Sequence, residues 1–176
     1  KKNGFAPVRT AEFTVRNDTI GAEVPGCMEL DFFRAGLAPD PFFSGNPLTY
    51  QQFENRHLWY YTEFDAPEGA DELLFEGIDT IAEIYLNGVL LGKAENMMIP
   101  HAFPVSGLKK TGNSLVVHIL PAMIEARRYP LTPLTVGQYY NAASFPIRKA
   151  AYMYGWDIFP RFVSGGLFRP GCLVKN

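Results

Sequence analysis

The sequence is poor in charge and contains no long hydrophobic run. Among its 176 residues the charged share is 19%, the formal net charge is −2 and no basic stretch dominates, so the charge pattern does not favour nucleic acid as a partner. No uninterrupted apolar run approaches the roughly 20 residues that a membrane helix needs. We therefore expect a soluble domain that binds neither nucleic acid nor membrane, in a periplasmic, secreted or cytoplasmic protein alike.

Cysteine and histidine are also scarce. The two cysteines, Cys27 and Cys172, form no metal-binding motif. We interpret them as buried thiols that pack as small hydrophobic groups, with a disulfide between them as the alternative in an oxidising compartment. The three histidines, His57, His101 and His118, lack metal-ligand spacing, and His118, between apolar strand residues, is expected to be structural. We expect no metal and no cofactor.

Signatures of common enzyme classes are missing. The chain has no Gly-x-Ser-x-Gly nucleophile elbow, no phosphate-binding loop and no dinucleotide fingerprint. The carboxylates Glu63, Asp65, Glu76, Asp79 and Glu83 alternate with apolar residues or stand in turns, so exposed strand faces are expected for them. Since none is predicted to belong to a buried acid–base pair, we expect no catalytic residue in this chain.

The residues that are present favour a single all-β domain. Hydrophobic residues make up 47% of the chain, which is ample for a core. Short runs rich in β-branched and aromatic residues predict strands at 13–15, 58–64, 73–76, 80–86, 103–105, 114–120 and 171–174. Asn17-Asp18 predicts a turn after the first run, and Asn87-Gly88, between apolar runs, predicts a tight hairpin. Strands without a βαβ rhythm indicate a β-sandwich.

Two short helices and long loops complete the expected architecture. The helices are predicted at 28–35, ending at Gly36, and within 121–129 before a proline. Prolines and glycines make 37–48 a loop, in which Phe42 and Phe43 are expected to pin the chain to the core. A second loop is expected at 131–144. Because the chain starts without methionine and stops just after an expected strand, we expect it to be a piece of a longer protein.

The stretch from Ile147 to Arg161 combines basic, aromatic and acidic residues around Trp156 and Asp157. A tryptophan offers a flat apolar face for a sugar ring, and an aspartate accepts hydrogen bonds from sugar hydroxyls. From residue types alone, a buried tryptophan and a turn aspartate are the alternative reading. On residue types alone this second reading is the favoured one for both residues.

Eight motifs in order along the chain resemble the N-terminal sugar-binding domain of glycoside hydrolase family 2, and within it the β-mannosidase branch. The resemblance covers about Val24 to Val174. The motifs are Val24-Pro25-Gly26-Cys27, Gly36-Leu37-Ala38-Pro39-Asp40-Pro41-Phe42, Trp59-Tyr60-Tyr61-Thr62-Glu63-Phe64, Phe75-Glu76-Gly77-Ile78-Asp79-Thr80, Ile84-Tyr85-Leu86-Asn87-Gly88, Pro100-His101-Ala102-Phe103, Ile147-Arg148-Lys149-Ala150 and Gly155-Trp156-Asp157.

The resemblance implies a jelly-roll β-sandwich similar to galactose-binding domains, spanning residues 1–176 as one domain with 1–23 as a partial leading arm. It also implies a larger glycosidase that continues into an immunoglobulin-like domain and a (β/α)₈ barrel, where two glutamates act by the retaining route. This domain would be non-catalytic and would pack on the barrel. Trp156 and Asp157 would line the pocket for a terminal β-mannoside, which the domain shares with the catalytic barrel.

The sequence departs from the family pattern just after this pair. Ile158-Phe159-Pro160-Arg161 follows Asp157, where β-mannosidases typically show Trp-Gly-Pro-Arg, and the change bears on the loop's conformation and on mannose preference. Three alternatives stay open. One is a sibling family 2 enzyme such as an exo-glucosaminidase or galactosidase, and one is a structural domain with Trp156 buried. The third is a stand-alone carbohydrate-binding module, whose aromatic platform would have to come from Tyr139, Tyr140, Tyr152 and Tyr154.

Overall fold

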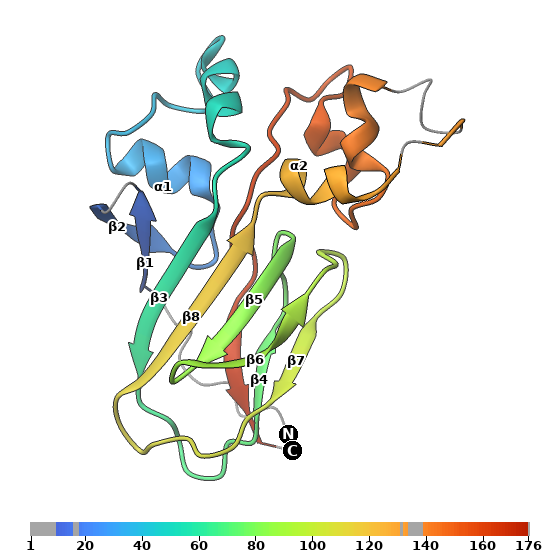
Figure 1. Ribbon diagram of the computed structural model, residues 1–176. Helices are drawn as coiled ribbons and strands as arrows, with labels where there is room; N and C mark the ends of the chain where they lie inside the picture. The colour runs from blue at the N-terminus through green and yellow to red at the C-terminus, as the bar shows by residue number, and fades with distance from the viewer. Residues whose placement is uncertain (1–9, 16–17, 131, 134–138, 176) are drawn as a thin grey trace.

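The computed structural model describes residues 10–15, 18–130, 132–133 and 139–175, which form two antiparallel sheets with short helices at one end (Figure 1). The larger sheet has the strand order β2-β1-β3-β8-β5-β6 and the smaller one the order β7-β4-β9. The strands of the larger sheet are, in that order, Asp18–Glu23, Thr10–Val15, Leu58–Phe64, Asn113–Leu120, Ile81–Leu86 and Val89–Ala94. Those of the smaller sheet are His101–Pro104, Glu72–Phe75 and Gly171–Val174.

The core lies between the two sheets because alternate side chains of each strand point inward. In β5, Ala82, Ile84 and Leu86 are buried while the residues between them are half-buried, as the two-residue period of a strand requires. They share one hydrophobic cluster with Phe75 of β4 and Phe103 of β7. The predicted all-β sandwich is confirmed.

The predicted hairpin at Asn87-Gly88 is also confirmed. Asn87 has φ 50° and Gly88 has φ 80°, the positive values that a type I′ turn requires at both positions. The Asn87 side chain fixes this turn to β8, since its Oδ1 accepts a hydrogen bond from the backbone N–H of Ser114 at 3.0 Å and its Nδ2 donates one to Asn113 Oδ1 at 3.1 Å. The other predicted strands agree with the structure to within a few residues. Residue 17 of the predicted Asn17-Asp18 turn lies outside the described residues.

The helices gather at the end of the sheets that is uppermost in Figure 1. Both predicted helices are present: α1 spans Met28–Arg34 and is followed by Gly36 with φ 70°, and α2, Ala122–Glu125, continues as the 3₁₀ helix η2, Ala126–Arg128. Further 3₁₀ helices are η1 at Asn46–Phe53, η3 at Tyr139–Ser144 and η4 at Ala151–Tyr154. The predicted loops are therefore shorter than expected, since η1 and η3 occupy their ends.

The prediction that Phe42 and Phe43 pin the 37–48 loop to the core is wrong. Their side chains are 83% and 69% exposed. Tyr50 of η1 anchors the segment instead, because its ring is buried and its hydroxyl donates to the carbonyl of Pro39 at 2.6 Å and lies 3.2 Å from that of Glu29. With the anchor supplied by a polar aromatic, the two phenylalanines are left on the surface.

Candidate functional site

Trp156 and Asp157 lie at the tip of a hairpin that projects from the helical end of the domain. Trp156 and Phe159 exchange backbone hydrogen bonds of 3.0 and 3.1 Å, so we call residues 156–159 the tip hairpin. Gly155 enters it with φ 106°, a value that favours glycine. Trp156 is 68% exposed, and Asp157 is also exposed. Both predicted site residues are therefore free to meet something outside this chain.

The alternative in which Trp156 is buried is wrong. The residues that enter the core at this point are Tyr154 and Val163, on either side of the tip hairpin. They pack with Ala122 and Ala126 next to the sheets. Since these side chains fill the space, the tryptophan is left outside.

Of the four tyrosines considered for an aromatic platform, the structure describes the side chains of two, and one of these is buried. Tyr154 is 2% exposed, whereas Tyr152 is 51% exposed and contacts Phe159 edge to face at 5.2 Å. The side chains of Tyr139 and Tyr140 lie outside the described residues. Tyr152 is thus one aromatic side chain beside the tip hairpin and is not by itself a flat platform.

Arg161 braces the stem of the hairpin against η1. Its Nε and Nη2 donate to the two carboxylate oxygens of Glu54, each at 2.7 Å, and its Nη1 donates to the carbonyl of Tyr154 at 3.1 Å. A bidentate guanidinium–carboxylate pair fixes direction as well as distance. The arginine of the family motif therefore has a structural partner here.

A cleft of about 290 Å³ lies beside the hairpin. Its lining includes the exposed side chains of Phe42, Tyr152 and Phe159 and the buried carboxylates of Glu29 and Asp79. The exposed loop before η1 and residues 152–159 therefore contribute to one mostly apolar cleft, whose lining also includes two carboxylates.

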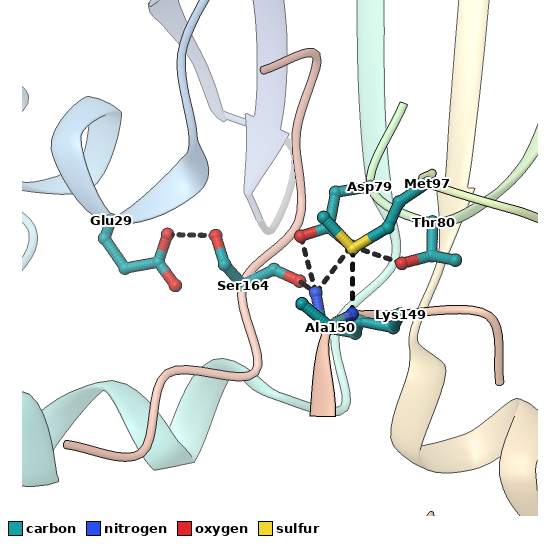
Figure 2. A network of polar contacts seen from close by, with 7 residues as sticks. All are labelled: Glu29, Asp79, Thr80, Met97, Lys149, Ala150 and Ser164. Atoms are coloured by element: carbon teal, nitrogen blue, oxygen red, sulfur yellow. Dashed lines mark hydrogen bonds and ion pairs between the residues drawn. The ribbon is translucent and has the colours of Figure 1, made fainter. Parts of the chain in front are cut away.

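Asp79, which lines this cleft, belongs to a buried ion pair, and this contradicts the prediction of an exposed Asp79. Asp79 is 3% exposed, and both of its carboxylate oxygens lie 2.5 Å from Lys149 Nζ (Figure 2). The same ammonium donates to the carbonyl of Ser164 at 2.9 Å. A buried carboxylate is tolerated only when it is paired and hydrogen-bonded, and Lys149 provides that pairing.

Sequence reasoning also missed Glu29, which is joined to this network through Ser164. The Ser164 hydroxyl donates to Glu29 Oε2 at 2.6 Å, while Glu29 Oε1 is buried without a hydrogen-bond partner among the described residues. The residue is 4% exposed, and burial raises the pKa of its carboxyl above the ordinary value of 4.5. A glutamate among the large apolar residues of the 28–35 helix was the available signal.

Replacing Glu29 with glutamine is expected to stabilise the domain more at pH 8 than at pH 4. The pKa of Glu29 is higher in the folded state than in the unfolded state. The stability that protonated Glu29 contributes to the wild-type domain is therefore fully present below the unfolded-state pKa and is lost as pH rises through the folded-state pKa. The loss has a limiting slope of about 1.4 kcal/mol per pH unit, and glutamine does not ionise. Urea unfolding at both pH values tests this, with the exposed Glu68→Gln as the control. An equal effect of Glu29→Gln at the two pH values would contradict the prediction.

The remaining candidate metal ligands do not lie close together. In the described part of the chain, no group of three or more histidine, cysteine, aspartate or glutamate side chains is placed to hold a metal ion. His118 stacks on Trp59 with ring centres 3.7 Å apart and shares a 2.8 Å contact with His57, as expected of a structural residue. Cys27 and Cys172 form no disulfide with each other and are half-buried rather than buried, and burial raises the pKa of Cys27 to about 12, which keeps its thiol protonated at neutral pH.

Glu83 is less exposed than the sequence indicated. Its side chain is 20% exposed and forms an ion pair with Lys93 at 2.7 Å and a 3.4 Å contact with His118. The hydrogen bond from Lys93 is the main reason why the pKa of Glu83 is lowered to about 2. This carboxylate belongs to the sheet surface, away from the tip hairpin.

Among the residues that the structure describes, no helix is both long and apolar enough to cross a membrane.

Comparison with known families assigns the fold that carries this site. The model of the glycosyl hydrolase 2 galactose-binding-domain-like family matches residues 10–169. The chain belongs to this family. The tip hairpin and the buried network both lie within the matched range of this galactose-binding-like domain, and the family predicted from the eight motifs is confirmed.

The relatives of this glycosyl hydrolase 2 domain include β-mannosidases. Beta-mannosidase B of Thermothelomyces thermophilus is 33% identical over 163 residues, covering 85% of this chain and 18% of its own length. Beta-mannosidase of Mus musculus is 32% identical over 164 residues, covering 85% of this chain and 19% of its own. The chain thus spans about a fifth of the length of these relatives.

Solved structures agree with the fold of the domain. The β-D-mannosidase of Dictyoglomus thermophilum superposes with a TM-score of 0.82 at 32% identity, over 99% of this chain and 22% of that one. An exo-β-D-glucosaminidase superposes with a TM-score of 0.64 at 15% identity, over 96% of this chain and 20% of that one. The second likeness concerns the fold alone.

Proposed function

We propose that this domain is the non-catalytic N-terminal part of a β-mannosidase-like glycosidase, in which it lines the pocket for a terminal β-mannosyl residue. The observation that carries the proposal is the exposed Trp156-Asp157 pair on a braced hairpin. Similarity to three β-mannosidases at 32–33% identity supports the choice of sugar. The binding partners are thus a β-mannoside and the catalytic domain of the same protein.

The chemistry of the pair suits positioning rather than bond cleavage. The indole face of Trp156 can cover the apolar face of a pyranose, and the Asp157 carboxylate accepts charge-assisted hydrogen bonds from hydroxyls. Retaining glycosidases need two carboxyl groups roughly 5 Å apart on either side of the scissile bond, and Asp157 has no such companion at the tip hairpin. Its part would be to hold the sugar in the reactive orientation, which lowers the barrier without chemistry.

Exposed apolar side chains near the hairpin support contact with a further domain. Phe42, Phe43 and Leu48 are 69–83% exposed, and Ile158 at the tip is 91% exposed. Phe42 and Phe159 line the same cleft, so the two segments that carry these side chains are neighbours. An apolar surface of this kind favours packing against another protein surface.

A substrate panel tests the function. The longer protein that contains this domain is expected to hydrolyse an aryl β-mannoside with a higher kcat/KM than the matched β-galactoside, β-glucosaminide or β-galacturonide. Because Ile158-Phe159 departs from the β-mannosidase pattern, the substrates of the sibling enzymes are the relevant comparison.

The 176-residue chain alone is expected to show no turnover. Calorimetric titration of this chain with mannose or mannobiose is expected to show little or no binding, because part of the pocket is absent. Micromolar binding by the chain alone would favour a stand-alone binding module, and a preference for another glycoside would replace mannose as the substrate.

A further inference from the structure

The loop of residues 150–163, which carries the tip hairpin, is closed at its base by one buried ammonium group. Lys149 immediately precedes this loop and Ser164 immediately follows it. Lys149 Nζ donates to the carbonyl of Ser164 at 2.9 Å and lies 2.5 Å from each carboxylate oxygen of Asp79 (Figure 2). The lysine side chain has no exposed surface. Its three N–H donors therefore have three acceptors, two from Asp79 and one from Ser164.

Asp79 is itself held in the sandwich by backbone hydrogen bonds. Its backbone N–H donates to the carbonyl of Gly166 at 2.9 Å, and the Gly166 N–H donates back at 3.2 Å, just before β5 begins. The chain around Lys149 is held as well, because the backbone N–H of Ala150 donates to Met97 Sδ at 3.1 Å. The ammonium thus joins both ends of the loop to a fixed point of the sheet.

We propose that Lys149 is a positioning residue that sets where the tip hairpin, and with it Trp156 and Asp157, stands relative to the sandwich. The proposal rests on the proposed function of that pair. Lys149 does not touch the substrate and acts through the direction that it gives to the loop.

Backbone hydrogen bonds also hold the residues next to the loop, from the N–H of Met97 to the carbonyl of Arg148 and from the N–H of Met28 to the carbonyl of Gly165, each at 3.0 Å, but each of them fixes one end alone. The bonds between Trp156 and Phe159, and from the N–H of Phe162 to the carbonyl of Met153 at 2.9 Å, lie within the loop. They define the shape of the hairpin but not its direction. The pair between Arg161 and Glu54 braces the stem from η1, whereas Lys149 fixes the base. A displacement of about 1 Å at the sugar is enough to cost a large part of the rate.

The test compares Lys149→Met with Ile84→Ala in the longer protein. Ile84 of β5 is fully buried in the sheet core, so its truncation destabilises the domain without touching the loop. Two readouts are used: amide hydrogen exchange of peptides from 150–163, and kcat and KM for an aryl β-mannoside. Lys149→Met is expected to speed exchange in 150–163 by about tenfold or more and to lower kcat/KM by about tenfold to a hundredfold. Ile84→Ala is expected to change both by less than about twofold under conditions where it stays folded.

A double variant keeps the test decisive if Lys149→Met does not fold. Asp79→Leu with Lys149→Met removes both charges, and replacing a buried ion pair by apolar groups is often neutral for stability. The double variant is expected to unfold near the wild-type urea midpoint while its 150–163 peptides still exchange faster and its kcat/KM stays low. Wild-type exchange and kinetics in either folded Lys149 variant would overturn the proposal. If the wild-type protein does not cleave β-mannosides, the proposed function fails, and the exchange of 150–163 decides on Lys149 by itself.

Discussion

Asp79→Ala is expected to lower the free energy of unfolding of this domain by about 3–5 kcal/mol. The substitution leaves the ammonium of Lys149, which has no exposed surface, with the carbonyl of Ser164 as its one remaining acceptor among those described above. Removing one partner of a buried pair costs more than the pair contributes, because the other charge stays buried and unpaired. Domains of this kind are stable by only about 5–15 kcal/mol, so a large part of the stability is at stake.

Urea unfolding of the 176-residue chain measures this effect. The control is Glu68→Ala, an exposed carboxylate in a turn, which is expected to change stability by less than about 0.5 kcal/mol. For a domain of this size each kcal/mol lowers the melting temperature by about 2–4 °C, so the Asp79 variant is expected to melt roughly 10 °C earlier. A loss no larger than that of the control would show that Lys149 reaches water in the folded protein.

Asp157→Ala is expected to lower kcat/KM of the longer protein for a β-mannoside by about tenfold to a hundredfold or more. This range corresponds to the loss of one or two hydrogen bonds to a charged group, each contributing about 1.5–3 kcal/mol. Asp157→Asn retains one acceptor oxygen and is expected to lose less. Because Asp157 is exposed at the tip hairpin, neither variant should change the unfolding of the domain by more than about 0.5 kcal/mol.

Kinetics of the two Asp157 variants and of Glu68→Ala, with the same substrate, carry this test. Glu68 lies in a turn far along the chain from the hairpin and is expected to leave kcat/KM unchanged. If Asp157→Ala retained wild-type kcat/KM, Asp157 would be a turn residue, and the pocket wall would have to come from elsewhere.

Most of the sandwich could be predicted because its signals are local. Asn87-Gly88 predicts its own turn from the positive φ that both positions need, and the structure shows φ 50° and 80° there. Glycine after the 28–35 segment predicts the end of α1 in the same way. The prediction for Phe42 and Phe43 failed because nothing in the neighbouring residues indicates whether the side chain of a loop phenylalanine packs into the core. That depends on Tyr50 having already filled the space and anchored the loop.

The sequence predicted the two residues at the tip hairpin but missed the buried ion pair beneath the loop. The motif resemblance located Trp156 and Asp157, although their exposure followed only from the burial of Tyr154 and Val163 beside them. The pair of Asp79 and Lys149 joins residues 70 positions apart, and no pattern in either segment predicts such a contact. Alternation with apolar neighbours indicated an exposed aspartate, since a strand pattern cannot show a partner that arrives from a distant loop.

A structure of the longer protein with an unreactive β-mannoside bound would decide whether the tip hairpin forms a wall of the sugar pocket. A carboxylate oxygen of Asp157 is expected about 2.6–3.2 Å from a sugar hydroxyl, within hydrogen-bond range, and the Trp156 ring within ~4 Å of the sugar. A bound sugar that lies beyond ~4 Å from both side chains would contradict the claim that this hairpin forms a wall of the pocket.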